Sequence, residues 1–209
     1  MPETRISLYW SWSFNPQKVR LALEELALPY DLRAVDLQHG EQKSPPILRL
    51  NPNGQIPIIV SDGFVLWESN AILLYLGGLA KRLMPGGAEE QADLHRWLFY
   101  ESRHLSQPIG NIWFNTFAAP QFGRQPDKSA MAGVARSAQM LAPLLDLIER
   151  RLTGRAWMLG ETFSILDCCY APVLDALSLS SFDLAPFPSL CRYLSENRQR
   201  PAWKACEFR

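Results

Sequence analysis

Two residues near the start of the chain have side chains suited to chemistry, Ser13 and Asn15. They follow an apolar run and precede an amphipathic pattern, which predicts that they lie where a strand meets the N-terminus of a helix. At such a corner, backbone N–H groups are free and the helix dipole is positive, so it suits an anion such as phosphate, carboxylate or thiolate. The alternative is a plain turn in which these side chains only cap the helix.

A hydroxyl and an amide at this corner are sufficient to lower the pKa of a bound thiol. A free thiol has a pKa near 8.5, and lowering it by about two units needs about 2.7 kcal/mol in favour of the anion. Hydrogen bonds to a charged group contribute about 1.5–3 kcal/mol each, so one or two donors together with the helix dipole suffice. No strong base is required.

A second candidate feature is Pro57, which lies inside the apolar run from Ile56 to Val60. A proline cannot donate a hydrogen bond within a sheet, so it fits either at a strand start, in cis, or in trans on an edge strand. The residues leave both alternatives open. In the cis case, the N–H and C=O of Ile56 turn out of the sheet and are able to pair with an extended, peptide-like ligand.

The third feature is the pair Glu68 and Ser69, which precedes another helical pattern. Ser69 is a good N-cap, and capping alone would explain it. In a binding role, the Ser69 hydroxyl and the free N–H groups of the first turn would hold a ligand carboxylate. Glu68 would hold an ammonium group of the same ligand, and together these groups describe an α-amino-acid head.

The spacing of apolar residues predicts the elements that position these groups. The order is strand, helix, strand, then strand, strand, helix, which is that of the thioredoxin fold, with a right-handed crossover between two parallel strands. The predicted elements are a strand at Ile6–Trp10, a helix that begins at Pro16 and ends before Leu28-Pro29, a strand at Tyr30–Leu37, a short helix at Pro46–Leu50, strands at Ile56–Val60 and Phe64–Trp67, and a helix that ends at Gly77-Gly78.

The sequence pattern of the second half of the chain predicts helices. The predicted fold class is therefore α/β plus all-α, with a thioredoxin-like N-terminal domain (βαβ-ββα) over residues 1–80, a linker over 81–90, and an all-helical C-terminal domain over 91–209. The pattern predicts helices from Gln91 to Phe117 and from Ser129 to Leu152, a third from Ser164 with a capping box to Asp167, and shorter ones near Ser189 and Pro201. Three prolines, Pro108, Pro143 and Pro172, are expected to kink their helices or lie near helix ends.

Composition excludes several classes of partner. The chain has 21 basic and 21 acidic residues among its 209, and a net charge of zero disfavours nucleic acid and anionic membrane. There is no apolar run of the roughly 20 residues that a membrane span needs, and the N-terminus does not resemble a secretory signal. The four cysteines are expected to be buried free thiols, and the three histidines have no metal-ligand spacing, so we expect a cytoplasmic protein without a metal.

Taken together, the motifs resemble the cytosolic glutathione transferases. The resemblance rests on the serine turn after the first strand, on Asn51-Pro52-Asn53-Gly54-Gln55-Ile56-Pro57, and on Trp67-Glu68-Ser69 with the helix behind it. The Pro85-Gly86-Gly87 linker and the capping segment Phe163–Asp167 extend it over essentially the whole chain. Within the family the chain is most similar to the serine-type classes, in particular the bacterial theta and nu classes.

The resemblance implies one ligand, γ-Glu-Cys-Gly. Its γ-glutamyl head would lie at Glu68 and Ser69, its cysteine backbone at Ile56 beside Pro57, and its sulfur at Ser13. Aligning on Pro16 instead would put Phe14 in the place of the serine.

Ser13-Phe14-Asn15 is also similar to a Thr-Pro-Asn turn of the nu class, in which the asparagine contacts the sulfur and disulfide reductase activity is common. Gln55 occupies the position that often reaches the glycyl end of glutathione, and Gln42 lies where related classes have a histidine. Asn70 replaces a frequent arginine.

A transferase also needs an apolar pocket for its electrophile. Trp12 beside Ser13, together with Trp113, Phe114 and Phe117, are the candidates, although an aromatic stripe on a helix is more often core. The family implies glutathione as co-substrate, a small electrophile or disulfide as the other partner, and a homodimer with a role in detoxification. Two alternatives to conjugation stay open, a glutathione-dependent disulfide or peroxide reductase and a non-catalytic regulator on the same fold.

Overall fold

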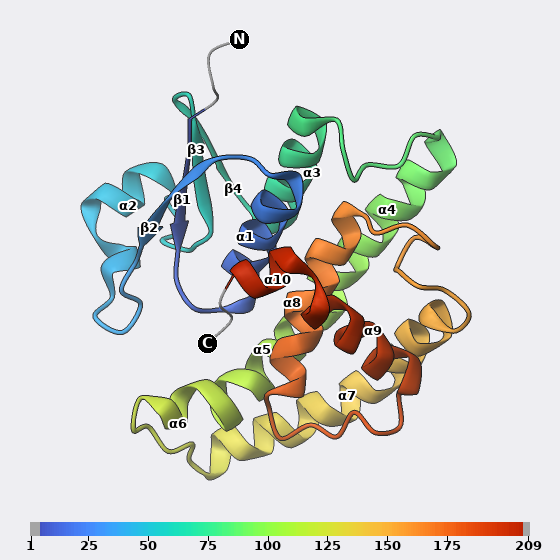
Figure 1. The fold of residues 1–209 in the computed structure, drawn as a ribbon. Coiled ribbons are helices and arrows are strands. Elements are labelled where there is room, and N and C mark those ends of the chain that lie inside the picture. The colour runs from blue at the N-terminus through green and yellow to red at the C-terminus, as the bar shows by residue number, and fades with distance from the viewer. Residues whose placement is uncertain (1–4, 207–209) are drawn as a thin grey trace. The chain divides into compact units, whose positions relative to one another are not determined.

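A computed structural model describes residues 5–206 of the chain (Figure 1). The described residues form two compact units. The first contains the residues up to Met84 together with those from Arg200 onward, and the second contains Pro85–Gln199. The predicted division into 1–80, 81–90 and 91–209 differs from this at the end of the chain, because the last helix belongs to the first unit.

The first unit is built on a four-stranded mixed sheet with the order β2-β1-β3-β4. Its strands are β1 (Ile6–Trp10), β2 (Tyr30–Ala34), β3 (Ile58–Ser61) and β4 (Phe64–Trp67). β1 and β2 are parallel, whereas β3 is antiparallel to both β1 and β4. Because β1 and β2 are joined through a helix and β3 and β4 through a tight turn, this is the predicted βαβ-ββα order.

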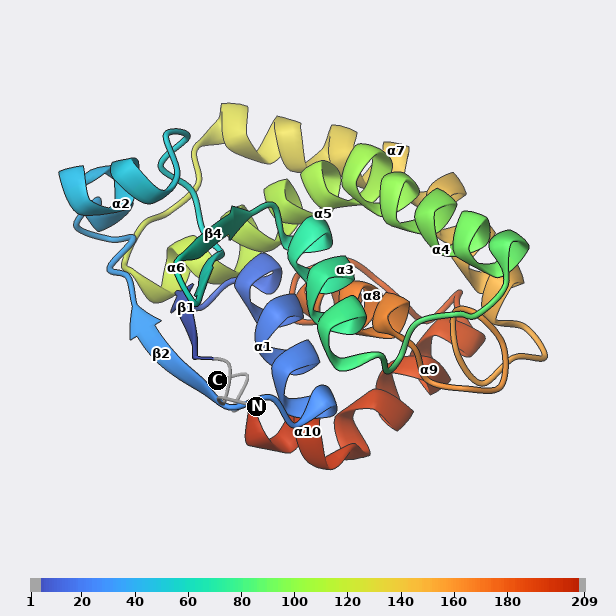
Figure 2. The ribbon, with the colours of Figure 1, turned by 90° about the horizontal axis from the view of Figure 1, so that it is seen from above.

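Helices cover both faces of this sheet. α1 (Phe14–Leu26) and α3 (Ser69–Ala80) lie side by side on one face, and α2 (Pro45–Leu50) lies on the other (Figures 1 and 2). The α2 face has its own small core, in which Val35, Ile47 and Ile58 are buried with Tyr9 packed against them. This packing holds the loops that follow β1 and β2 at a common end of the sheet.

Several predicted boundaries in this unit are wrong: α1 begins at Phe14 rather than Pro16 and α2 at Pro45 rather than Pro46, and three further differences have identifiable reasons. β3 begins at Ile58 rather than Ile56, because Pro57 has no N–H to offer the ladder. β2 ends at Ala34, three residues before the expected Leu37, and a loop with a turn at Asp36 follows. α3 continues through Gly77 to Ala80, and the glycine is explained by close packing instead of by a helix end: a Cβ on Gly77 would lie 2.6 Å from Met84 Sδ.

The short helix α10 (Pro201–Ala205) packs against α1. Arg200 Nη2 donates to Glu25 Oε2 at 2.8 Å, and Arg20 Nη2 donates to the carbonyl oxygen of Ala205 at 3.3 Å. Trp203 and Cys206 are buried. The C-terminal segment is therefore part of the packing of the first unit.

The second unit is helical, as expected. Its elements are α4 (Ala88–Tyr100), α5 (Ser106–Trp113), α6 (Ala119–Gln121), α7 (Lys128–Leu152), α8 (Ile165–Ser178) and α9 (Pro188–Gln199), with π-helical segments at Glu101–Leu105 and Phe114–Ala118. The two π-helical segments interrupt what the pattern predicted as one helix from Gln91 to Phe117. Pro108 follows the first of them in the opening turn of α5, where its missing N–H costs least.

α8 forms the core of the second unit. Its residues from Ile165 to Leu177 are all buried, as expected of a helix surrounded by others. Its N-terminus carries the predicted capping box, in which Asp167 Oδ2 accepts from the Ser164 backbone N at 2.8 Å and from its hydroxyl at 2.9 Å. Pro143 and Pro172 lie in the interiors of α7 and α8, not near their ends.

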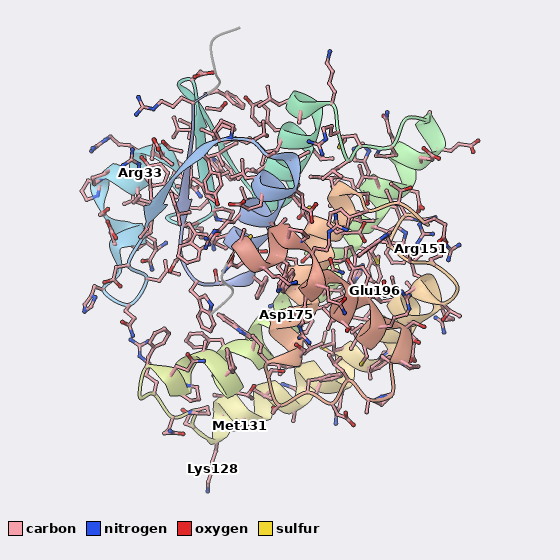
Figure 3. The ribbon with its side chains drawn as sticks, in the orientation of Figure 1. Arg33, Lys128, Met131, Arg151, Asp175 and Glu196 are labelled. Atoms are coloured by element: carbon pink, nitrogen blue, oxygen red, sulfur yellow. The ribbon has the colours of Figure 1, made fainter. Side chains whose placement is uncertain are left out.

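An ion pair links α7 to α4 in this unit. Arg151 near the end of α7, labelled in Figure 3, donates to Asp93 Oδ2 at 2.6 Å and to the carbonyl oxygen of Met158 at 2.7 Å. Its guanidinium also lies 5.3 Å from the ring centroid of Trp97. Within residues 5–206, no helix combines the length and the apolar character that crossing a membrane would require.

Candidate glutathione site

Ser13 occupies the N-cap position of α1, with an extended backbone (φ −158°, ψ 160°). Its backbone N–H donates to Ser11 O at 2.9 Å, and its carbonyl accepts from the N–H of Gln17 at 3.2 Å. The Ser13 side chain makes no capping hydrogen bond. A serine whose hydroxyl does not cap its own helix has that hydroxyl available for a ligand, which disfavours the simple turn that the residues alone allowed.

Buried polar atoms without a partner are frequent in the segment that contains Ser13, where residues 10–17 hold four of them. Among residues 5–206, seven buried side-chain nitrogen or oxygen atoms have no hydrogen-bond partner. Five of the seven belong to the first unit: Trp10 Nε1, Asn15 Oδ1, both amide atoms of Gln17, and Gln42 Oε1. Since buried polar groups are normally satisfied, such a concentration indicates a place where a polar ligand or ordered water completes the bonding.

The strand register brings the predicted glutathione-binding segments to one end of the sheet. Ile58 is opposite Tyr9 on one side and opposite Trp67 on the other. The segment after β1, which leads to Ser13, therefore lies beside the start of β3 and beside the end of β4. β2 runs parallel to β1, with Ala34 opposite Trp10, so the loop after β2 also leaves at this end.

The Ile56–Pro57 peptide bond is cis, which decides between the two alternatives that the residues left open. The preceding turn is organised by Asn51, which is buried. Its Nδ2 donates to the carbonyl oxygen of Gln55 at 2.8 Å, and its Oδ1 accepts from the backbone N of Asn53 at 3.1 Å. Ile56 lies outside the β3 ladder, while the Gln55 side chain is exposed.

Glu68 and Ser69 lie at the start of α3, but the helix begins one residue earlier than the sequence pattern predicted. The N-cap is Glu68, whose φ of 73° and ψ of 109° are unusual for a residue with a side chain. Such a conformation costs on the order of 1–3 kcal/mol, and residues that adopt it cluster at binding sites. Ser69 is instead the first helical residue and is only 9% exposed, so its expected role as the N-cap is wrong.

The loop after β2 carries a cation, Lys43, that no motif in the sequence indicated. Gln42 and Lys43 lie in a short 3₁₀ turn (Glu41–Lys43), and Lys43 Nζ donates to Asn53 O at 2.8 Å. A Cβ on Gly54, which has φ +58°, would lie 2.7 Å from the Lys43 chain, so a glycine is needed there. Lys43 thus lies against the turn that leads to Gln55. In the sequence, only its position next to Gln42 could have indicated that it belongs to the site.

The charged loop between β2 and this turn is internally bonded. Asp36 accepts hydrogen bonds from His39 Nδ1 at 2.6 Å and from the backbone N–H groups of Gln38 and His39. These bonds, above all the one from the His39 side chain, lower the pKa of the Asp36 carboxyl. These hydrogen bonds therefore give the loop a defined shape.

The expected pocket residues differ in exposure. In the second unit, Trp113 is 8% exposed and belongs to the core, whereas Phe114 is 45% exposed and Phe117 is half-buried. The Trp113 and Phe117 rings lie 6.5 Å apart between centroids. Trp12, in the first unit, is half-buried. Phe114 therefore offers the most open aromatic surface of this group.

The cysteines and histidines add no metal centre to the described part of the chain. No group of three or more His, Cys, Asp or Glu side chains within residues 5–206 is arranged to hold a metal ion. The four cysteines are free thiols, and Cys168, Cys169 and Cys206 are buried as expected. Cys191 is exposed, so the expectation of four buried thiols is wrong there, because its position on α9 faces outward.

A thioredoxin-like unit with a cis-proline directly before its third strand, followed by a helical unit, defines the glutathione transferase fold, and comparisons with known proteins agree. The model of the glutathione S-transferase N-terminal domain matches residues 12–79, and that of the glutathione S-transferase C-terminal domain matches residues 131–205. The chain belongs to the glutathione S-transferase family and is a glutathione transferase.

Individual relatives support this assignment. The chain is 33% identical to the disulfide-bond oxidoreductase YfcG of Escherichia coli K12, over 94% of this chain and 92% of the relative. It is 30% identical to the glutathione S-transferase GstB of the same organism, over 91% of each chain. A crystal structure of a glutathione transferase from Pseudomonas putida, with one glutathione disulfide bound per subunit, has a TM-score of 0.84 and 28% identity, covering 98% of this chain and 91% of that one.

Proposed function

We propose that the enzyme holds the thiolate of glutathione at Ser13, with help from Asn15, for attack on an apolar electrophile. The observation that supports this most directly is that the Ser13 hydroxyl at the N-terminus of α1 makes no capping bond. The hydroxyl donates to the sulfur, and the free N–H groups of the first turn add their positive potential. Because the thiolate is then the dominant form near neutral pH, the reaction needs no separate base.

The remainder of glutathione is assigned to the end of the sheet where the strand register gathers the other segments. Glu68 binds the ammonium group and Ser69 the carboxylate of the γ-glutamyl head, while the backbone of Ile56, beside Pro57, pairs with the cysteinyl peptide unit. The glycyl end lies toward Gln55 and Gln42. Lys43, against the same turn, supplies a positive charge for the glycyl carboxylate.

Further features belong to this proposal. The electrophile contacts Trp12 and the aromatic group Trp113, Phe114 and Phe117. The enzyme acts in the cytoplasm as a homodimer in the detoxification of small apolar molecules, and it is of the serine type, near the theta and nu classes. The donor set at the site is made of hydroxyl, amide and backbone groups and suits an organic thiol peptide.

Reduction of disulfides by glutathione is a second candidate function. Two observations favour it, namely the identity to a disulfide-bond oxidoreductase and the likeness to a structure that holds glutathione disulfide. Asn15 fits this chemistry, because its buried Oδ1 accepts from a thiol S–H, and its amide group, when rotated, donates to a thiolate. Assays with chlorodinitrobenzene and with hydroxyethyl disulfide, run side by side, separate the two, and a clear preference for the disulfide would overturn the conjugation proposal.

The role of Ser13 is tested by Ser13→Ala. Losing one hydrogen bond to a charged sulfur, about 1.5–3 kcal/mol, raises the pKa of bound glutathione by about one to two units. The measurement is thiolate absorbance against pH with saturating glutathione. Ser11→Ala, two residues earlier, is the matched control and is expected to leave the titration unchanged. An unchanged titration in Ser13→Ala would move the role to Asn15 or to the backbone donors.

A further inference from the structure

Gln17 in the first turn of α1 is buried in a way that α1 alone does not explain. The residue is 3% exposed, yet neither its Nε2 nor its Oε1 has a hydrogen-bond partner among residues 5–206. A buried amide whose donor and acceptor are both unsatisfied is costly, and an apolar side chain of equal length would avoid the cost. A group that is neither exposed nor bonded to protein is therefore expected to bond to a ligand or to water.

The position of Gln17 relative to Ser13 limits which ligand or water can bond to the Gln17 amide. The Gln17 backbone N–H donates to Ser13 O at 3.2 Å, so the two residues span one helical turn. Residues four apart lie on one face of a helix, and helical side chains lean toward the N-terminus. The Gln17 amide is thus directed along the face that carries Ser13, whose own hydroxyl makes no capping bond.

The two orphaned atoms identify the chemistry of the missing partner. Nε2 needs an acceptor and Oε1 needs a donor. A thiolate only accepts, and an apolar electrophile does neither. Ordered water does both, and a polar site with several unsatisfied groups is where buried water is found. Water next to Gln17 is therefore the partner that its amide requires.

We propose that Gln17 is a positioning residue that acts on the glutathione sulfur through Ser13. An ordered water accepts from Gln17 Nε2–H and donates to Ser13 Oγ, and a neighbouring water donates to Gln17 Oε1. The Ser13 hydroxyl, which then accepts one hydrogen bond, is left with its proton directed at the sulfur. A hydroxyl that accepts a hydrogen bond is also a stronger donor, so the network lowers the pKa of the bound thiol.

This inference rests on the proposed role of Ser13, and its test compares the two residues. Gln17→Met keeps the length of the side chain and removes both hydrogen-bonding atoms. We expect the pKa of bound glutathione to rise by about half a unit, a threefold change in the thiol–thiolate equilibrium, with a matching fall in kcat near neutral pH and little change in the KM for glutathione. Gln91→Met, at an exposed glutamine of α4, is the control and should change neither.

A double variant shows whether Gln17 acts through Ser13. In a Ser13→Ala background, Gln17→Met is expected to cause no further rise in the pKa, because the water then has no hydroxyl to orient. If Gln17 only fills space, Gln17→Met raises the melting temperature and leaves the titration unchanged, which would overturn the inference. An effect of equal size in both backgrounds would also overturn it.

The remaining outcomes separate this inference from the proposed function. If Ser13→Ala raises the pKa and Gln17→Met does not, only the inference about Gln17 is wrong. If Ser13→Ala leaves the titration unchanged, the proposed function itself fails. Should Gln17→Met not fold, Gln17→Leu is measured in the same assays, with the same rise expected.

Discussion

The carboxyl of Asp167, at the start of α8, makes a specific prediction about pH and stability. It has no solvent exposure and accepts four hydrogen bonds, from the Met158 backbone N (2.9 Å) and Tyr193 hydroxyl (3.1 Å) at Oδ1, and from the Ser164 backbone N (2.8 Å) and hydroxyl (2.9 Å) at Oδ2. Burial outweighs these bonds and raises the pKa of Asp167 to about 6, from an ordinary value of 3.8. The folded protein therefore binds a proton more tightly than the unfolded chain does.

The sign of the pH dependence follows from this difference. A raised pKa means that Asp167 contributes stability that is full below pH 3.8 and is lost as the pH rises through 6. With these two pKa values, the contribution of Asp167 to the free energy of unfolding is about 1.4 kcal/mol larger at pH 5 than at pH 7.5. Asp167→Asn cannot titrate, so the destabilisation that it causes should be about 1.4 kcal/mol greater at pH 5.

The assay is urea unfolding of the wild type and Asp167→Asn at both pH values. The double difference is the loss of unfolding free energy caused by Asp167→Asn at pH 5 minus the same loss at pH 7.5, and the effects of other carboxyls, which both proteins share, cancel in it. Tyr193→Phe supplies a second test in the same experiment. The Tyr193 hydrogen bond lowers the pKa of Asp167, so removing it should enlarge the pH dependence rather than abolish it. A double difference of zero, or a larger effect of Asp167→Asn at pH 7.5, would refute the reasoning.

Two further predictions concern packing in the first unit. Gly77→Ala should destabilise the protein by about 1–3 kcal/mol, because the new methyl group meets Met84 Sδ at 2.6 Å. Gly78→Ala places its methyl group where nothing lies within 4 Å and should stabilise the protein by about 0.5–1 kcal/mol. Thermal unfolding measures both variants, and equal effects would contradict the close approach at Gly77. For the half-buried pair Glu25 and Arg200, a double-mutant cycle with alanine should give a coupling energy of about 1–2 kcal/mol in urea unfolding, and additive single effects would show that the pair contributes nothing.

The fold was predictable because its patterns are local. The alternation of β1, the proline before β3 and the turn between β3 and β4 each identify a strand from a few neighbouring residues. Errors came where a distant contact decides. Gly77 looked like a helix end, but it is a site of close packing against Met84, which no local pattern reveals.

The candidate site was predictable to the extent that its residues have special chemistry. Pro57 leaves a mark in the sequence, because a proline inside a strand pattern narrows the choice to two conformations, of which the structure has the cis one. The positive φ of Glu68 leaves no such mark and was not predicted. Gln17 has no such mark, because a glutamine in an amphipathic helix is ordinarily exposed. Only its burial in the fold, together with its unsatisfied amide, distinguishes it.

The return of α10 to the first unit also affects how the protein folds during synthesis. The helical unit, Pro85–Gln199, is continuous and is complete once its last residue has been made, but the packing on α1 must wait for residues 200–206. Domains generally fold as units while the chain is being synthesised, N-terminal first. Here one part of the first unit is made before the helical unit and the other part after it, so the face of α1 that α10 packs against stays uncovered until residues 200–206 have been synthesised.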